Sequence, residues 1–149
     1  MVDSGANQSF AIVANNVTRS TMFWRTAHDS DVYGDDCFEM MLGAADDPAH
    51  YFHLAVNSLG TCYDANGNDV KWNVDAAINA ERCSDMWVVQ IAVPLERIHQ
   101  AVGKSSRYKF NLFRERYAGA KPECSSWAIV ERSFHEPQRF WGLELAPGK

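Results

Sequence analysis

The chain has 149 residues, 46 % of them hydrophobic and 22 % charged, a composition typical of one globular domain with a core. Its net charge of -5 and the lack of a basic stripe argue against a nucleic-acid partner, because phosphates are bound by clustered Lys and Arg. No apolar run approaches the roughly 18 residues that span a membrane, so we predict no membrane partner. Residues 1–5 lack the features of a signal peptide, which is compatible with an excised domain or a mature fragment.

The first half of the chain consists of short apolar runs separated by turn residues. Residues 1–7 are expected to form a flexible leader, and the domain is expected to occupy residues 8–147. The acidic segment before Pro48 predicts a turn, because Asp bonds nearby backbone and Pro ends strand pairing. Asn66-Gly67 predicts a second tight turn. The strands predicted in this half are residues 10–14, 21–26, 37–43, 51–57 and 60–64.

The second half continues this pattern around one short helix. The segment after the second turn is less regular, and Val74, Ala77 and Ile78 have helical spacing over a short span. Pro94 ends the clearest strand and suits the first turn of a helix, which Gly103 stops. Many short alternating strands with one minor helix predict an all-β fold, an antiparallel two-sheet β-sandwich of jelly-roll-like type. The strands predicted in this half are residues 86–93, 108–113, 125–130 and 140–145.

One stretch, Asp29 to Leu42, runs from an acidic loop into an alternating strand. Phe38 and Met40 fall on the same face as Leu42, whereas Glu39 falls in mid-strand on the opposite face. A carboxylate at this position costs β-propensity and is useful where a sheet binds a polar molecule. We therefore predict that this stretch forms the first wall of a binding site.

The residues opposite the apolar faces combine hydrogen-bonding side chains with small ones. Such a set can form a shallow trough in which a hydroxyl-rich ligand replaces its lost contacts with water. A wet outer face, or a polar layer beneath a loop, is the alternative interpretation. The set comprises Glu39, Met41, His53, Ala55, Asn57, Gln90, Ala92 and Asn111.

Aromatic residues in the flanking loops suit a sugar ligand, since the C–H faces of sugar rings stack on aromatic planes. Tyr33 precedes the Glu39 strand, and Phe134 lies in the long polar loop before the last strand. If the two loops lie at the same end of the sandwich, these side chains can hold one ring over the trough. Trp127 and Trp141 are rival candidates, although we expect a Trp within a strand to belong to the core.

Five short motifs occur in order along the chain. Their series resembles that of carbohydrate-binding module family 9 and its DOMON-like relatives, which are β-sandwiches, and the resemblance extends over residues 8–147. The motifs are Asp35-Asp36-Cys37-Phe38-Glu39, Phe52-His53-Leu54-Ala55-Val56-Asn57, Trp87-Val88-Val89-Gln90-Ile91-Ala92-Val93-Pro94, Phe110-Asn111-Leu112-Phe113-Arg114 and Phe140-Trp141-Gly142-Leu143-Glu144-Leu145.

The resemblance implies non-catalytic binding of sugar ends by a domain linked to an enzyme that degrades xylan or another plant polysaccharide, outside the cell or in the periplasm. By motif position, Tyr33 and Phe134 match two aromatics that hold the terminal sugar, and Glu39 matches a carboxylate that bonds its hydroxyls. The chain departs from the family in having Tyr and Phe where Trp is usual, Ala55 where an Arg is expected, and Gln90 for a Glu. The predicted ligand-binding residues are Tyr33, Glu39, His53, Gln90, Asn111, Arg114 and Phe134.

Members of this group often hold structural Ca²⁺, and two oxygen-rich stretches are candidates for it. One is the acidic loop, and the other, starting at Asp64, has the 1-3-5 spacing of a calcium loop but lacks its position-six Gly and position-twelve Glu. Ordinary solvated turns are the alternative, and no organic cofactor is expected. The candidate metal ligands are Asp29, Asp31, Asp35, Asp64, Asn66 and Asn68.

Three alternatives to sugar binding are a haem protein, an enzyme and an interaction or structural module. DOMON relatives include haem-b cytochromes, and Met41 and His53 share a presumed face, but the polar Glu39 and Gln90 suit a buried porphyrin poorly. No G-x-S-x-G or H-E-x-x-H motif occurs, so we predict that the domain is not an enzyme. A sandwich that serves as an interaction or structural module without a sugar site is the main alternative.

The four cysteines allow three pairings if all are oxidised, and none forms a C-x-x-C pair. Free, partly buried thiols are favoured over a disulfide framework. The four are Cys37, Cys62, Cys83 and Cys124.

Overall fold

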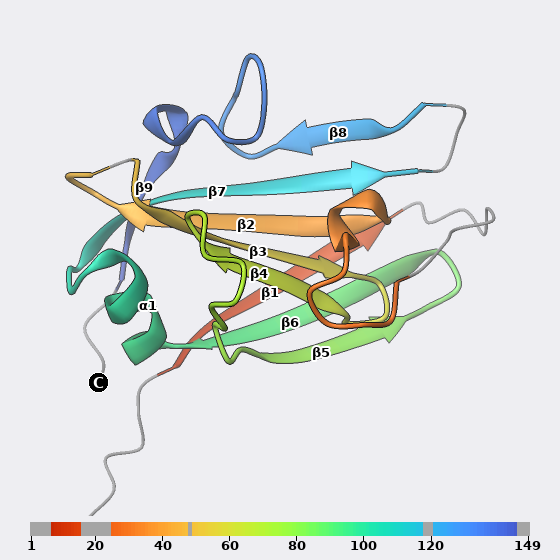
Figure 1. The fold of residues 1–149 in the computed structure, drawn as a ribbon. Helices are drawn as coiled ribbons and strands as arrows, with labels where there is room; N and C mark the ends of the chain where they lie inside the picture. The colour runs from red at the N-terminus through yellow and green to blue at the C-terminus, as the bar shows by residue number, and fades with distance from the viewer. Residues whose placement is uncertain (1–6, 16–24, 48, 118–120, 146–149) are drawn as a thin grey trace, which may run out of the picture.

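The strands form two antiparallel sheets that pack face to face (Figure 1). The computed structural model describes residues 7–15 (backbone only), 25–47, 49–117 and 121–145. The larger sheet has the order β4 (Cys62–Asn66), β3 (Tyr51–Asn57), β2 (Cys37–Ala44), β7 (Arg107–Arg116), β8 (Glu123–Ser126), and β9 (Trp141–Glu144) also pairs with β7. The smaller sheet has the order β1 (Asn7–Asn15), β6 (Met86–Pro94), β5 (Ala77–Arg82). The predicted all-β two-sheet sandwich is confirmed.

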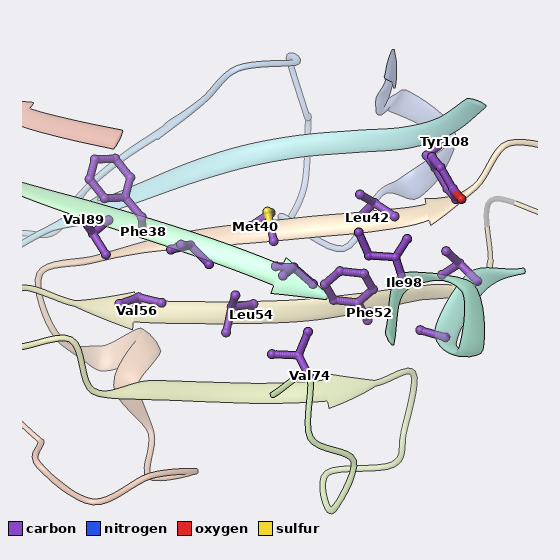
Figure 2. Close-up of a cluster of buried hydrophobic side chains, with 14 of the residues drawn as sticks. Phe38, Met40, Leu42, Phe52, Leu54, Val56, Val74, Val89, Ile98 and Tyr108 are labelled. Carbon is purple, nitrogen blue, oxygen red and sulfur yellow. The ribbon is translucent and has the colours of Figure 1, made fainter. Parts of the chain in front are cut away.

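The core lies between the sheets and follows the predicted alternation. Phe38, Met40 and Leu42 of β2 point inward and belong to one buried cluster with Val89 of β6 (Figure 2). Trp87 of β6 belongs to the same cluster. Each of these side chains is at most 6 % exposed. Since successive residues of a strand face opposite ways, Glu39 and Met41 lie on the outer face of the larger sheet.

The predicted helix is confirmed as α1 (Leu95–Val102), which begins directly after Pro94. Its buried residues Ile98 and Val102 join the core at one end of the sandwich. Gly103 ends the helix with a φ of 82°, a left-handed conformation that glycine adopts without strain. At the other end of the sandwich, the one-turn helix η1 (Val32–Gly34) leads into β2 (Figure 1).

The structure differs from prediction in three segments. The helix-like spacing before Cys83 was misleading, since β5 is a strand in which Ile78 and Ala80 alternately pack against the core. β8 ends at Ser126, so Trp127 lies outside it and is 62 % exposed, and Trp141 of β9 is 58 % exposed. The expectation that both Trp residues belong to the core was therefore wrong. Residues 21–24 of the predicted aromatic strand lie outside the described residues, as do most of the leader and residues 146 and 147 at the predicted end of the domain.

Candidate functional site

The outer face of the larger sheet carries a pocket of about 520 Å³. Its residues come from η1, from five strands of the sheet and from the segment after β8. The lining consists of Tyr33, Glu39, His53, Tyr63, Glu115, Cys124, Ser133, Phe134 and His135. Four of the seven predicted ligand residues are thus placed around one cavity, namely Tyr33, Glu39, His53 and Phe134.

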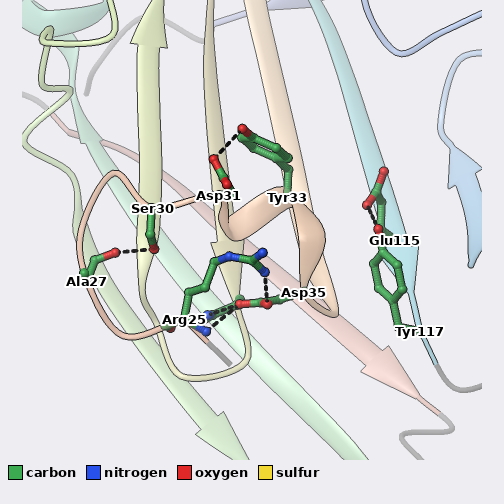
Figure 3. A network of polar contacts seen from close by, with 9 residues as sticks. Arg25, Ala27, Ser30, Asp31, Tyr33, Asp35, Glu115 and Tyr117 are labelled. Atoms are coloured by element: carbon green, nitrogen blue, oxygen red, sulfur yellow. Dashed lines mark hydrogen bonds and ion pairs between the residues drawn. The ribbon is translucent and has the colours of Figure 1, made fainter. Parts of the chain in front are cut away.

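The η1 turn supports the first wall. Val32 is fully buried in a small cluster with Cys37, Ala55 and Tyr63, which fixes η1 on the sheet. Tyr33 is 41 % exposed, and its hydroxyl donates to Asp31 Oδ1 at 2.7 Å (Figure 3). Its ring meets the Tyr63 ring edge-on, with 5.4 Å between ring centroids. The ring is therefore oriented by a hydrogen bond and an aromatic neighbour while it remains accessible to a ligand.

A second anchor holds the chain before η1. Asp35 is buried and forms an ion pair with Arg25, with 2.7 Å between Nη1 and Oδ1 (Figure 3). Asn57 Nδ2 donates to Asp35 Oδ2 at 2.9 Å and to the carbonyl of Arg25 at 2.9 Å. Asp35 and Asn57 therefore have a structural role. Asn57, which was predicted to line the trough, instead holds the segment that precedes η1.

The segment between β8 and β9 forms the opposite wall. Asn111 of β7 donates from Nδ2 to the carbonyl of Ala128 at 3.1 Å, and its Oδ1 accepts the Ala128 N–H at 2.8 Å. Further along, the Glu136 carboxylate accepts the N–H groups of Glu131 and Arg132 at 2.9 and 2.8 Å. These bonds, with Arg139, hold the pKa of Glu136 below its usual range. The wall is thereby fixed on the sheet, and the one-turn helix η2 (Pro137–Arg139) directly follows Glu136.

Phe134 projects from this wall. Its ring stacks on Phe113 of β7, with 4.2 Å between centroids and 22° between planes. One face of Phe134 is used in this way, and the other is left for the pocket that the residue lines. Next to it, His135 Nδ1 lies 2.8 Å from the hydroxyl of Tyr51. Burial lowers the pKa of His135 and raises that of Tyr51, so at neutral pH a neutral phenol and a neutral imidazole share this hydrogen bond, whose direction is set by the imidazole tautomer.

The floor contains a buried carboxylate–imidazole pair. Glu39 Oε2 lies 2.6 Å from His53 Nε2, and the two residues are 3 % and 8 % exposed. Their strand positions were predicted to share a face, and β2–β3 pairing brings them together. Glu39 Oε1 makes no hydrogen bond to another described residue, so it is available to a ligand hydroxyl.

Glu115 of β7 adds a second carboxylate beside Glu39. Its Oε2 accepts the hydroxyl of Tyr117 at 2.9 Å (Figure 3). Burial, and secondarily the charge of Glu39, raises the pKa of Glu115. The described residues that line the pocket include no Lys or Arg. The pocket is therefore acidic and aromatic, a combination suited to a neutral, hydroxyl-bearing ligand that donates hydrogen bonds.

Three predicted ligand residues lie elsewhere. Gln90 belongs to β6 of the smaller sheet, where it is exposed and accepts a hydrogen bond from Asn79, so its inclusion in the trough was wrong. Asn111 is on the correct face but is fully buried beneath the Ala128 segment. Arg114 has the strand parity of the core-facing residues of β7 and pairs with Phe38, whereas its neighbour Glu115 faces the pocket.

Five lining residues were not predicted. Tyr63 could have been found, because the alternation of the return strand places it opposite Cys62 and Asp64. Glu115 lies past the predicted end of its strand, which extends to Arg116. Cys124 lies just before the predicted start of its strand, which begins at Glu123. Ser133 and His135 depend on where the segment after β8 crosses the sheet, and no periodicity encodes that path.

The predicted calcium ligands do not form two oxygen-rich loops. Asp35 is engaged by Arg25, and Asp31 accepts the Tyr33 hydroxyl. Asp64 and Asn66 belong to strand β4 instead of a loop, because the turn begins after Asn66. Burial raises the pKa of Asp64. Calcium binding stays a prediction.

Neither haem ligation nor catalysis gains support from this geometry. Met41 is fully buried with Phe113 and Phe140, and His53 is bonded to Glu39, so neither is presented as an axial ligand. Glu39 and Glu115 lie side by side on adjacent strands of the floor, whereas glycoside hydrolysis requires carboxylates that flank the scissile bond.

The four cysteines are free: Cys37 is buried, Cys62 half-buried, and Cys83 and Cys124 exposed. Burial raises the pKa of the Cys62 thiol to about 11 and that of Cys37 further still. Burial also raises the pKa of Cys124, so these three thiols are protonated at neutral pH.

Comparison with known proteins bears on the fold. No protein-family model matches the chain, and no curated protein matches it at a significant level. The structure is similar to a crystal structure from Bacteroides uniformis of a protein proposed to bind carbohydrate, with a TM-score of 0.69. The sequences are 16 % identical, and the match covers 91 % of this chain and 71 % of that one. At this identity the likeness shows a shared fold. None of the helices in the described part of the chain is long and apolar enough to cross a membrane.

Proposed function

We propose that this domain is a non-catalytic carbohydrate-binding module, related to family 9 and the DOMON-like sandwiches, that binds one sugar ring in the outer-face pocket. The observation that carries the proposal is the convergence of Tyr33 and Phe134, from segments about 100 residues apart, on one pocket above the Glu39–His53 pair. The shared fold with a protein proposed to bind carbohydrate supports it.

Each wall supplies what a sugar requires. The two aromatic rings offer apolar surface to the C–H faces of the ring, while Glu39 Oε1 and Glu115 accept hydrogen bonds from hydroxyls. The floor is already ordered, because Glu39 is held by His53 and Glu115 by Tyr117, so little conformational entropy is lost on binding. The polysaccharide would be a plant polymer such as xylan, and the domain would act beside a linked catalytic domain outside the cell or in the periplasm.

The test is calorimetry or affinity electrophoresis against xylan, cellulose fragments and simple sugars. Tyr33→Ala should weaken binding at least about tenfold, since it removes an exposed anchor worth about 1.4 kcal/mol or more. Phe134→Leu should do the same while still covering Phe113, which keeps the effect on stability small. Trp141→Ala is the matched control, because this exposed aromatic does not line the pocket.

If the domain bound no sugar on a broad glycan array, the result would contradict the proposal. It would favour the alternative of a protein-interaction module, for which three exposed apolar side chains outside the pocket offer surface. They are Trp127, Ile129 and Trp141.

A further inference from the structure

A second cluster of side chains lies at the edge of the larger sheet, beside strand β4. His28, Cys62 and Asp64 each offer one ligand atom, and these three atoms lie within 4.8 Å of one another. His28 belongs to the segment before η1, whereas Cys62 and Asp64 share the inward-facing parity of β4. The three residues thus converge from two separate segments.

One oxygen of the Asp64 carboxylate in this cluster has no hydrogen-bond partner. The residue is 1 % exposed, and its Oδ2 accepts the N–H of Val74. Its Oδ1 is buried and has no hydrogen-bond partner. The nearest cationic candidate is His28 Nε2, at 3.5 Å, which is too long for a good hydrogen bond. A buried carboxylate oxygen without a partner costs free energy, which a bound cation would offset.

The distance between the imidazole and the carboxylate of this cluster matches that in a tetrahedral metal site. Zinc binds imidazole nitrogen and carboxylate oxygen at about 2.0–2.2 Å, which separates two such ligands by about 3.3–3.6 Å. The 3.5 Å between His28 Nε2 and Asp64 Oδ1 falls in that range. The other ring nitrogen, His28 Nδ1, lies 2.9 Å from Asp29 Oδ2. A carboxylate that accepts the second N–H of a histidine is the usual support of a metal-binding imidazole, because it fixes the tautomer that turns Nε2 toward the metal.

We infer that His28, Cys62 and Asp64 form a Zn²⁺ site in which Asp29 orients His28 and the fourth position is left for water. Thiolate and imidazole ligands select zinc over calcium, which prefers oxygen alone. Binding replaces the Cys62 thiol proton, which is released to solvent. The half-exposed His28 side chain gives the ion a path to the site.

The position of the site gives it a structural role next to the pocket. A metal here joins the segment that leads to Tyr33 with the strand that carries Tyr63, which lies between Cys62 and Asp64. The bound metal would thereby hold Tyr33 and Tyr63, which line the first wall of the pocket, in fixed positions relative to each other. The inference does not depend on what the pocket binds.

The test uses the whole chain, stripped of metal with a chelator and titrated with ZnCl₂. We expect one Zn²⁺ per chain, a raised melting temperature, and a thiolate-to-metal absorption band when Co²⁺ replaces Zn²⁺. Cys62→Ser and His28→Ala should each weaken Zn²⁺ binding at least about tenfold and abolish the rise in melting temperature. Cys83→Ser and His50→Ala, which alter exposed residues outside the cluster, should behave as the parent protein.

Three results would overturn the inference: no zinc bound at stoichiometric metal, unchanged affinity in Cys62→Ser and His28→Ala, or equal stabilisation by CaCl₂. Circular dichroism of each metal-free variant establishes that it is folded. Asp64→Asn provides a further variant, since its side-chain oxygen can still accept the Val74 N–H while the negative charge is lost. It should also bind zinc more weakly than the parent.

Discussion

Asn111→Ala should detach the Phe134 wall from the sheet. Asn111 is fully buried and makes two hydrogen bonds to the backbone of Ala128, one as donor and one as acceptor. Removing the amide leaves the buried N–H and C=O of Ala128 without partners. At about 1–2 kcal/mol for each orphaned group, the free energy of unfolding should fall by about 2–4 kcal/mol.

Urea denaturation of the parent and variant measures this difference, and calorimetry with the best sugar ligand measures its effect on binding. Affinity should fall because Phe134 loses its position, although Asn111 does not line the pocket. Asn79→Ala is the matched control: this exposed Asn makes one long side-chain bond of 3.4 Å, so its loss should change stability by about 0.5 kcal/mol or less. Lost binding with unchanged stability in Asn111→Ala would refute the reasoning, because it would mean that Asn111 contacts the ligand itself.

Two further predictions concern charge in the pocket. Glu39→Gln retains a hydrogen bond to His53 but removes the carboxylate charge, so sugar affinity measured by calorimetry should fall about tenfold; unchanged affinity would exclude Glu39 as an acceptor of sugar hydroxyls. The pKa of His135 is lowered from its ordinary 6.5, so its contribution to stability is present above 6.5 and is lost as pH falls through the folded pKa. Protonation makes Nδ1 the donor to the Tyr51 oxygen and places a positive charge in the pocket that His135 lines, and sugar affinity should therefore decrease from pH 7 toward pH 5. The same decrease in Tyr51→Phe would show that this hydrogen bond is not its cause.

The part of the site that could be predicted from sequence is the part encoded by strand alternation. Glu39 and His53 occupy outward positions of two consecutive strands, and consecutive strands usually pair, so their contact follows from local pattern. The position of Tyr33 beside Glu39 could also be predicted from local sequence, because Tyr33 lies in the turn directly before β2. The two-sheet sandwich could be predicted for the same reason, as nearly every strand shows its own period of two.

Alternation does not tell which sheet a strand joins. Gln90 and Glu39 both lie opposite an apolar face, yet their strands are in different sheets, so the core separates them. Alternation also does not tell what covers a face. Asn111 points outward as predicted, but the segment after β8 crosses over it, and the amide bonds that segment. The polar layer beneath a loop was the correct alternative for Asn111 and Asn57, while the pocket remains above Glu39.

The covering of the outer face also bears on what the pocket can hold. Along β2 the outward residues are Cys37, Glu39 and Met41. Val32 packs with Cys37 at one end, and Phe140 packs with Met41 at the other, so the sheet surface is closed on both sides of Glu39 along the strand. A polysaccharide that passed along β2 would meet these covers, whereas a single ring fits between them. For the sugar ligand that we propose, we therefore expect an end to bind better than an internal unit of a chain that runs along β2.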